Sequence, residues 1–482
     1  MPFDHGAFAR AAERLYREGR FSADLLATEE VRGLTEETYR ALNAAIDYSI
    51  REETPPELTA ALRQNTFIFS GFKTYHQLQE ASALLTHEDG TVRAYGEFEE
   101  DVKRIDGQYN TAYLRAEYNH AVHSAQMAVK WHEWEKDGDE YNLQYRTAGD
   151  ERVREAHAAL DGVTLPPGDK FWDRYLPPNG WNCRCQVVQV LRDDYPQSDS
   201  GQATAWGDAC TAEPKEKIFR FNAGKELKLF PPKHPYFKPD TRDKQHVETI
   251  IEAQSDEMRI TELRSQLPNH LTDAEKDAIA AHNHTLEKQL GICIGKPMST
   301  EDADKQSANP RYNDNEAYRI NCQTCAPAYA LRLMGFNVTA KANTPGSLSE
   351  YLSYQRSFEA WKNIDGSATT PVLTYEWMVA HGYKTMTASR YRTYFEETCK
   401  DTGVYILTIG WKGGGGHATI LQRFDDGELR YIEPQHYDAS IGAKRPIDKL
   451  CNYGETKPYP KRGILRVDNK LFEEKYLSIF DK

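Results

Sequence analysis

Residues 321–325 read Asn-Cys-Gln-Thr-Cys and precede an alanine-rich apolar segment that ends at Gly335. Four glycines at 413–416 then lead into His417, and Glu433 follows the next run of β-forming residues. A thiolate attacks a carbonyl, an imidazole takes up its proton, and a third polar group holds the imidazole in one tautomer. These residue types, in this order, predict a nucleophilic site built from one helix and an antiparallel sheet.

The elements around this site follow from local patterns. The apolar residues from 326 to 334 predict a helix that Gly335 ends, and unpaired N–H groups at the start of a helix stabilise a thiolate. Three strands are predicted after it, near 404–409, 418–424 and 429–432. The turn at residues 425–427, Asp-Asp-Gly, joins the last two strands into a hairpin, so His417 and Glu433 are expected side by side.

Two assignments within this site stay open. Cys322 is the expected nucleophile, but Pro327 fits best in a first helical turn, which would place Cys325 nearer the helix start. Glu433 is expected to orient His417, with Gln435 as the alternative. The oxyanion is expected to bind backbone N–H groups at the helix start, helped by Gln323 or Asn321.

Residues 295–482 resemble the papain-fold toxin family, often described as glutamine deamidases and found as C-terminal domains of polymorphic toxins. The resemblance rests on the Asn-Cys-x-x-Cys stretch, the Gly-His-Ala core at His417 and the Glu-Pro-Gln stretch at Glu433. It implies a papain-like fold, Cys322, His417 and Glu433 as catalytic residues, a host target protein and an immunity protein. The family usually has Asp where this chain has Glu433.

Other interpretations of the same residues are weaker. Cys322 and Cys325 could form half of a zinc site, but no second ligand pair follows at the right spacing. The glycines at 413–416 could hold a phosphate, but no Lys-Ser/Thr follows and a strand comes next. His417 and Cys322 could also be ordinary core residues.

A second cluster of motifs lies between residues 145 and 185. It runs from Tyr-Arg-Thr-Ala-Gly-Asp at 145–150 through His157 to Pro-Pro-Asn-Gly-Trp-Asn-Cys-Arg-Cys at 177–185. With the helix before it, this segment resembles the phage Mu F-like head morphogenesis family over residues 70–192. That resemblance implies a minor head protein with portal and capsid proteins as partners, located in the virion.

His157, Cys183 and Cys185 offer three metal ligands, with Asp161 or Asp150 as a fourth. Two cysteines one residue apart point to the same side of a strand, which is workable but uncommon for tetrahedral zinc. The favoured interpretation is that these residues hold a small turn-rich module together by hydrogen bonds and packing, with zinc as the alternative. No other cofactor is expected.

Size and composition limit the remaining possibilities. At 482 residues the chain should form several domains. No apolar run is long enough to span a membrane, and the first residues lack the layout of a secretory signal. A net charge of -13 argues against specific nucleic-acid binding. Eight cysteines, four of them isolated and four in two close pairs, fit a reducing compartment.

We therefore predict an α+β, multi-domain chain. A mostly helical head-morphogenesis region with a small turn-rich β module occupies 1–193, a linker with polar helices 194–294, and a papain-like domain 295–482. The predicted protein is a phage minor head protein of the virion interior whose C-terminal thiol effector acts on a glutamine amide in the host cytoplasm. The alternatives are a cysteine protease and a purely structural head protein with an inert C-terminal binding module.

Overall fold

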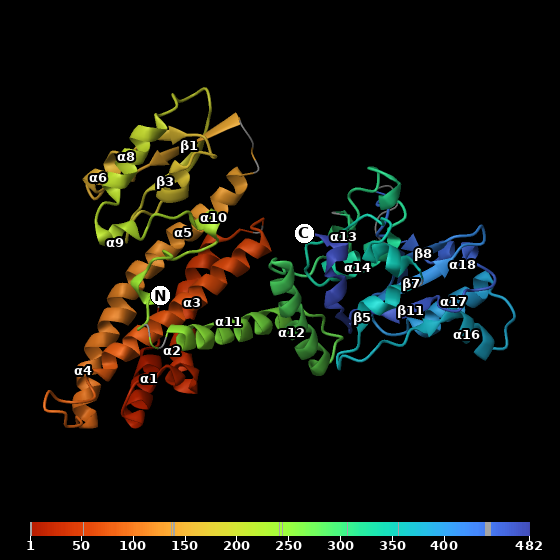
Figure 1. Cartoon of the computed structure of the whole chain (residues 1–482), viewed down its shortest axis with the longest axis horizontal. Coiled ribbons are helices and arrows are strands. Elements are labelled where there is room, and N and C mark those ends of the chain that lie inside the picture. Colours follow the sequence, from red (N-terminus) through yellow and green to blue (C-terminus); the bar gives the residue numbers. More distant parts are fainter. Residues whose placement is uncertain are drawn as a thin grey trace. The chain divides into compact units, whose positions relative to one another are not determined.

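A computed structural model describes residues 2–51, 53–135, 137, 140–240, 242, 244–305, 307–354, 356–438 and 445–482. The chain divides into two compact units, Met1–Met258 and Arg259–Lys482 (Figure 1). Each unit combines helices with antiparallel sheet, which confirms the predicted α+β class. In the described part of the chain, no helix has the length and apolar character needed to cross a membrane.

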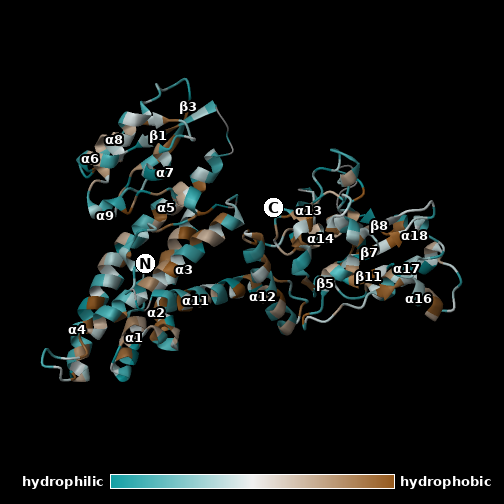
Figure 2. Cartoon of the chain, viewed as in Figure 1, coloured by the Kyte–Doolittle hydropathy of each residue, from teal (hydrophilic) through white to brown (hydrophobic). Residues whose placement is uncertain are grey.

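Unit 1 begins with a set of long helices, in agreement with the mostly helical region predicted there. They are α1 (His5–Glu18), α2 (Glu29–Ser49), α3 (Pro56–Ser82), α4 (Tyr95–Gly107), a π-helical turn η2 (Gln108–Tyr113) and α5 (Leu114–Trp134), with a short 3-10 helix η1 (Ala23–Ala27) between the first two. Hydrophobic residues recur along α2 and α3 between hydrophilic ones, as expected of helices with one buried face (Figure 2). Their buried side chains form one hydrophobic core.

A buried ion pair lies within this helical core. Lys73 of α3 donates from Nζ to Glu117 of α5 at 2.5 Å and to the carbonyl of Tyr109 at 2.8 Å. Both side chains are almost completely buried. Burial lowers the pKa of Lys73 and raises that of Glu117, and the attraction between the two groups opposes both shifts. Each charge therefore offsets the cost of burying the other, and removal of either residue would leave an uncompensated buried charge.

The turn-rich module that follows contains a small antiparallel sheet in the order β2-β1-β3. Its elements are β1 (Tyr141–Arg146), α6 (Glu155–Ala158), β2 (Thr164–Leu165), α7 (Phe171–Tyr175) and β3 (Gln186–Leu191). Phe171 and Trp172 are fully buried in its core, whereas Trp181 is half-buried.

Residues 194–294, predicted to be a linker with polar helices, belong to the two compact units in the structure. The first part of this segment forms α8 (Ser200–Cys210), α9 (Pro214–Lys217), α10 (Ala223–Glu226) and the 3-10 helix η4 (Pro235–Phe237), and it packs on the helices of unit 1. Phe230 stacks on Phe69 with ring centroids 3.7 Å apart. The prolines do break helices here, but the aromatic residues between them are apolar enough to be buried. Two longer helices follow, α11 (Lys244–Gln266), which crosses the boundary between the units, and α12 (Asp273–Leu290). A capping box formed by Thr272 and Glu275 begins α12.

Unit 2 is built on an antiparallel sheet in the order β10-β9-β8-β7-β11-β6. Its strands are β6 (Val372–Leu373), β7 (Gly403–Gly410), β8 (Gly416–Arg423), β9 (Leu429–Ile432), β10 (Arg445–Pro446) and β11 (Gly463–Arg466). The three predicted strands coincide with β7, β8 and β9. Two two-stranded sheets add β5 (Trp361–Lys362) with β12 (Leu471–Phe472) and β4 (Thr339–Ala340) with β13 (Phe480–Asp481).

Alternate residues of β7 enter two different cores. Val404 and Ile406 pack in the core that contains α14 (Cys322–Arg332), whereas Tyr405 and Leu407 pack in the core on the opposite face. That second core contains α16 (Thr374–Ala380), α17 (Ala388–Thr398) and α18 (Asp448–Tyr453). The remaining helices are α13 (Thr300–Lys305), α15 (Leu348–Ser353), η5 (Glu316–Tyr318), η6 (Ser357–Ala360) and η7 (Glu474–Ile479). The sheet is thus covered by helices on both faces, and α14 contacts β8, the strand that carries His417.

Candidate functional site

Cys322 is the first residue of α14. The helix begins at Cys322 and contains Pro327 in its interior, so the alternative in which Pro327 marks the first turn and Cys325 lies nearer the start does not hold. The cost of Pro327 inside the helix is one missing backbone hydrogen bond. The side chain of Cys322 therefore lies where unpaired N–H groups at the helix start can stabilise negative charge.

Cys325 lies one turn deeper and is a poor candidate for the nucleophile. It is completely buried, whereas Cys322 is 8% exposed. Burial raises the pKa of the Cys325 thiol well above its usual range, and the thiol donates to Asn321 Oδ1 at 3.2 Å. Of the two cysteines, only Cys322 combines partial access with the helix start.

The predicted contact between His417 and Glu433 is present. His417 is the second residue of β8, and Glu433 follows the last residue of β9. The register pairs Ile420 with Ile432, so Glu433 falls opposite Thr419 and two positions away from His417. Nε2 of His417 lies 2.8 Å from Oε2 of Glu433. That contact leaves Nδ1 of His417 available to a thiol.

The charges of this pair depend on each other. Burial alone would lower the pKa of His417, but Glu433 and a hydrogen bond with Cys322 outweigh it and raise this pKa to about 10. Burial would likewise raise the pKa of Glu433, but the attraction of His417 keeps it below its usual value. The raised pKa favours the cationic form of His417 at neutral pH, next to the carboxylate of Glu433.

Further groups fix the carboxylate and the ring. The hydroxyl of Tyr431 donates to Glu433 Oε2 at 2.6 Å, and the backbone N–H of Gln435 donates to Oε1 at 3.2 Å. The indole of Trp411 stacks on the His417 ring at a centroid distance of 5.7 Å. Tyr431 was not among the predicted residues, although its position two residues before Glu433 on the same strand was a usable signal.

Gln435, the alternative to Glu433, has another role. Its side-chain amide donates to Asn321 Oδ1 at 3.3 Å, while its carbonyl accepts from Asn309 at 3.0 Å. Asn321 in turn donates to Asn309 and to the carbonyl of Lys341. These buried amides tie the start of α14 to the chain after β9, so the amide of Asn321 is not available to an oxyanion.

Gln323, the other predicted oxyanion group, keeps a usable donor. Its Oε1 accepts from the hydroxyl of Ser357. Among the described residues, no protein acceptor is paired with its amide N–H groups. Ser357 comes from the 3-10 helix η6, far along the chain, and no local sequence pattern marks it.

The glycine run before His417 forms the turn between β7 and β8. Gly414 and Gly415 have φ of 93° and 85°, which side chains other than glycine rarely adopt. The Arg462 guanidinium donates to the carbonyl of Gly415, and a Cβ atom at Gly410 would lie 1.4 Å from this guanidinium. The glycines therefore allow a tight turn beneath Arg462, and no phosphate-binding helix follows them.

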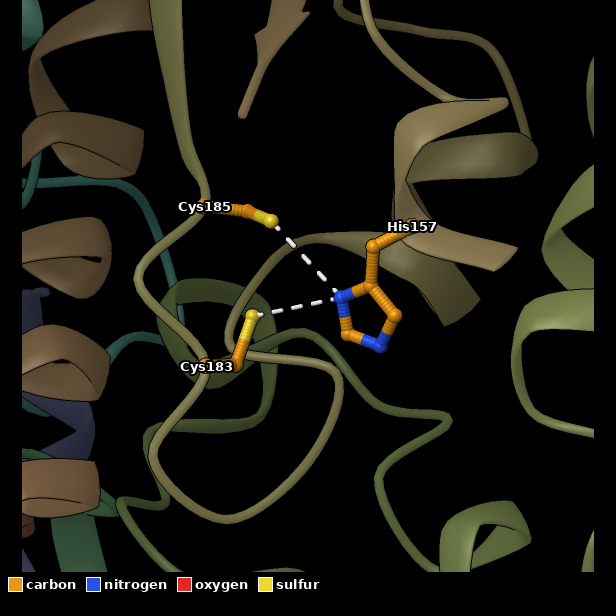
Figure 3. A group of neighbouring side chains, drawn as sticks. All are labelled: His157, Cys183 and Cys185. Atoms are coloured by element: carbon orange, nitrogen blue, oxygen red, sulfur yellow. Dashed lines mark hydrogen bonds between the residues drawn. The ribbon is translucent and has the colours of Figure 1, made fainter. Parts of the chain in front are cut away.

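His157, Cys183 and Cys185 form a second cluster, in unit 1 (Figure 3). His157 comes from α6, and both cysteines lie in the loop before β3, where Asn182 has a left-handed φ of 57°. Nδ1 of His157 lies 3.6 Å from the sulfur of Cys183 and 3.6 Å from that of Cys185. The hydrogen bond from Cys185 and the nearby His157 hold the pKa of Cys183 well below its usual range, although burial opposes them, whereas the same pairing raises the pKa of Cys185.

Neither carboxylate predicted as a fourth ligand belongs to this cluster. Asp150 forms two hydrogen bonds with Arg184, at 2.6 and 2.7 Å. Asp161 accepts from the backbone and hydroxyl of Thr147. Both carboxylates therefore form hydrogen bonds within the surrounding loops. Their spacing in the sequence did not indicate these contacts.

Comparison with known proteins locates a relationship in unit 1. Residues 90–188 match the family described as "Phage Mu protein F like protein", which confirms the predicted resemblance for this region. The matched range includes α5, strands β1 and β2, the start of β3 and all three residues of the His157 cluster.

Two curated proteins are similar over part of their length. "Putative capsid assembly protein F" of Escherichia phage Mu is 31% identical over 129 residues, 24% of this chain and 27% of that protein. "Mu-like prophage FluMu F protein" of Haemophilus influenzae is 34% identical over 77 residues, 16% of each chain. The chain thus spans 27% and 16% of the length of these relatives. No solved structure matches it.

Proposed function

We propose that this chain takes part in phage head assembly through its Phage Mu F-like region, and that unit 2 is a papain-like thiol amidohydrolase acting on a glutamine side chain. The first part rests on the match of residues 90–188 and on the printed name of the phage Mu relative. Portal and capsid proteins are then its assembly partners, and the virion is its location. A host target and an immunity protein belong to the second part.

One observation carries the hydrolase proposal: Nε2 of His417 lies 2.8 Å from Glu433, and Cys322, which helps to raise the pKa of His417, opens a helix that packs against the His417 strand. A cationic imidazole next to a sulfur stabilises the thiolate, the nucleophilic form. Glu433 holds the ring through Nε2, which leaves Nδ1 to exchange a proton with the sulfur in this proposal.

The reaction follows from these positions. The Cys322 thiolate attacks the amide carbon, and the carbonyl oxygen becomes an oxyanion held by N–H groups at the start of α14 and by the amide of Gln323. The C–N bond breaks as His417 gives its proton to the leaving ammonia, which leaves a thioester on Cys322. Water then gives a proton to His417 and attacks the thioester, so that a carboxylic acid forms and Cys322 is released.

Deamidation and peptide cleavage share this chemistry, since both pass through the same thioester. The resemblance to papain-fold toxins favours deamidation. Peptides from cells that express the wild-type chain or Cys322→Ala separate the outcomes. Glutamines converted to glutamate support a deamidase, new chain termini indicate a protease, and identical peptide sets indicate an inert binding module.

The test that needs no substrate is alkylation of each cysteine by iodoacetamide, followed by peptide mass spectrometry. At about pH 6, ordinary thiols with pKa near 8.5 react slowly. We expect fast labelling of Cys322 that is lost in His417→Ala and slow labelling of Cys325. Fast labelling of Cys325 would move the nucleophile by three residues. Slow labelling of both would contradict the hydrolase.

The assembly proposal has its own test. Purified particles of a phage that encodes this chain should contain it, together with the portal protein, when probed by an antibody against unit 1. A variant that lacks residues 90–188 should be absent from the particles. Finding the chain in infected cells but in no particle or particle precursor would contradict a head protein.

A further inference from the structure

The thiol and imidazole groups of the His157 cluster all point to one spot. Figure 3 shows the two cysteine side chains and the ring of His157 turned towards each other from α6 and from the loop before β3. Their ligand atoms lie within 4.8 Å of one another, and all three residues are buried. No step of the proposed function uses them.

We infer that His157, Cys183 and Cys185 bind one divalent ion of the zinc class, whose fourth ligand is an exchangeable water or anion from the adjoining cavity. Two thiolates and one imidazole are ligands that zinc prefers over calcium or magnesium. The two thiolates also neutralise the charge of the ion inside a buried site.

The distances fit such an ion. Zinc bonds are about 2.3 Å to sulfur and about 2.1 Å to nitrogen, so an S···N separation of 3.6 Å corresponds to an angle of about 110° at the metal. This is the tetrahedral angle, and it applies to both cysteines because their sulfurs are equally far from Nδ1 of His157. Both sulfur–nitrogen separations therefore match a tetrahedral ion bound by all three residues, whose ligand atoms lie within 4.8 Å of one another.

Hydrogen bonds alone satisfy the cluster less well. Nδ1 of His157 has one ring position for a hydrogen, so it cannot form two linear bonds to two sulfurs at once. The other ring nitrogen, Nε2, lies 3.4 Å from Nη1 of Arg154, a long contact. If Nδ1 binds a metal, Nε2 carries a proton and the long contact with Nη1 is lost. Arg154 still donates from Nη2 to the carbonyl of Trp181 at 2.8 Å.

The fourth position faces a cavity. The three ligand residues line a pocket of about 340 Å³ together with Arg152, Arg154 and Arg184. Asp150 and Asp161 are engaged elsewhere, so no carboxylate completes the set among the described residues. Three protein ligands with one open position is the arrangement in which zinc holds water, and the arginines favour an anion in its place.

Cobalt titration of the full-length chain, purified without a histidine tag and stripped with a chelator, tests this inference. Tetrahedral cobalt with thiolate ligands gives intense visible d–d bands and a near-ultraviolet charge-transfer band. We expect one equivalent per chain and displacement by zinc. Cys183→Ser and Cys185→Ser should lose the charge-transfer band in part, and the double variant completely, while His157→Gln should weaken binding at least tenfold. No tetrahedral signal in the wild-type chain would overturn the site.

Matched variants separate this site from other thiols. Cys210→Ser removes a buried cysteine of the same module, and Cys322→Ser with Cys325→Ser removes the close pair of unit 2. Both should bind cobalt like the wild type. If the unit 2 variant lost the cobalt signal and the Cys183 and Cys185 variants kept it, the metal would bind in unit 2. That result would overturn the inference.

Two further measurements decide the matter even if the ligand variants fail to fold. In the wild-type chain, zinc should protect Cys183 and Cys185 from alkylation, and a chelator should expose both by at least tenfold in rate. Unchanged labelling would contradict metal binding. Azide added to the cobalt form should shift the d–d bands, because it replaces the exchangeable ligand. Bands that stay constant would show a fourth protein ligand and contradict the open position.

Discussion

The described part of the chain contains a cysteine–histidine site in each unit, and the two sites differ in what accompanies the histidine. In unit 2, His417 bonds to the carboxylate of Glu433, and one thiol, that of Cys322, helps to raise its pKa. In unit 1, no carboxylate among the described residues bonds to His157, and two buried thiols share its Nδ1. A carboxylate partner makes an imidazole a proton carrier, whereas two convergent thiolates make it a metal ligand. The same two residue types thus support different chemistry according to the third group.

The largest expected effect separates the cysteines of unit 2. Cys322→Ala should lower the rate of amide hydrolysis by about 10³-fold or more, because the covalent step is lost. Cys325→Ala should keep most of the activity, because its thiol is buried beneath the site. The rate is measured as ammonia release from the target. Cys399→Ser, a buried cysteine outside the site, is the control for general damage. An active Cys322→Ala chain would reduce the unit 2 site to a structural cluster.

Unit 1 also has a buried charge pair, and it should matter for stability alone. Glu117→Leu leaves Lys73 charged and buried without its partner, which should cost about 3–5 kcal/mol of unfolding free energy. Urea denaturation of the full chain measures this loss in the transition of unit 1. The double variant Lys73→Met with Glu117→Leu should recover most of it. A single variant as stable as the wild type would show that the pair is dispensable.

The pair of His417 and Glu433 should affect both rate and pH dependence. Glu433→Gln should lower activity by about 10²-fold, because the imidazolium loses its counter-charge. The folded-state pKa of His417 is raised to about 10, so the pair stabilises the fold fully below the ordinary value of 6.5 and loses this effect as pH rises through 10. The variant should therefore be less stable than the wild type at neutral pH, and the two should converge above pH about 10. Denaturation at several pH values measures this, and a pH-independent difference would contradict it.

The smallest expected effect concerns the independence of the two sites. Cys183→Ser should alter the rate of Cys322 alkylation by less than about twofold, because the residues belong to separate compact units with separate cores. Chelator treatment of the wild-type chain should be equally silent at Cys322. A large change in either case would mean that the two sites communicate, and the comparison between them would no longer be one of independent chemistries.

The local parts of unit 2 could be predicted from the sequence. The contact between His417 and Glu433 follows from a hairpin whose turn and strands are contiguous, so its register could be counted. The start of α14 could not be placed, because proline preference favours the first turn whereas tertiary packing tolerates Pro327 inside the helix. Local preference loses to packing at such positions.

Contacts between segments that lie far apart in the sequence could not be predicted from local patterns. The amide network of Asn309, Asn321 and Gln435 joins three separate segments, and Ser357 reaches Gln323 from a fourth. In unit 1, the burial of Phe230 depends on helix α3, which lies more than a hundred residues earlier. The residues predicted as a linker pack on unit 1 instead. Prolines such as Pro231 indicate where helices are interrupted, but they do not indicate whether the neighbouring side chains are buried. Only the tertiary structure brings these residues together.

The order of strands in unit 2 has a consequence during protein synthesis. The ribosome has made Cys322, His417 and Glu433 once it passes β9, yet β7 still lacks its neighbour β11, residues 463–466. Until that strand emerges, one edge of β7 is open, and the hairpin that carries His417 has no complete sheet to support it. We therefore expect the arrangement of Cys322, His417 and Glu433 to form only after β11 has left the ribosome and paired with β7.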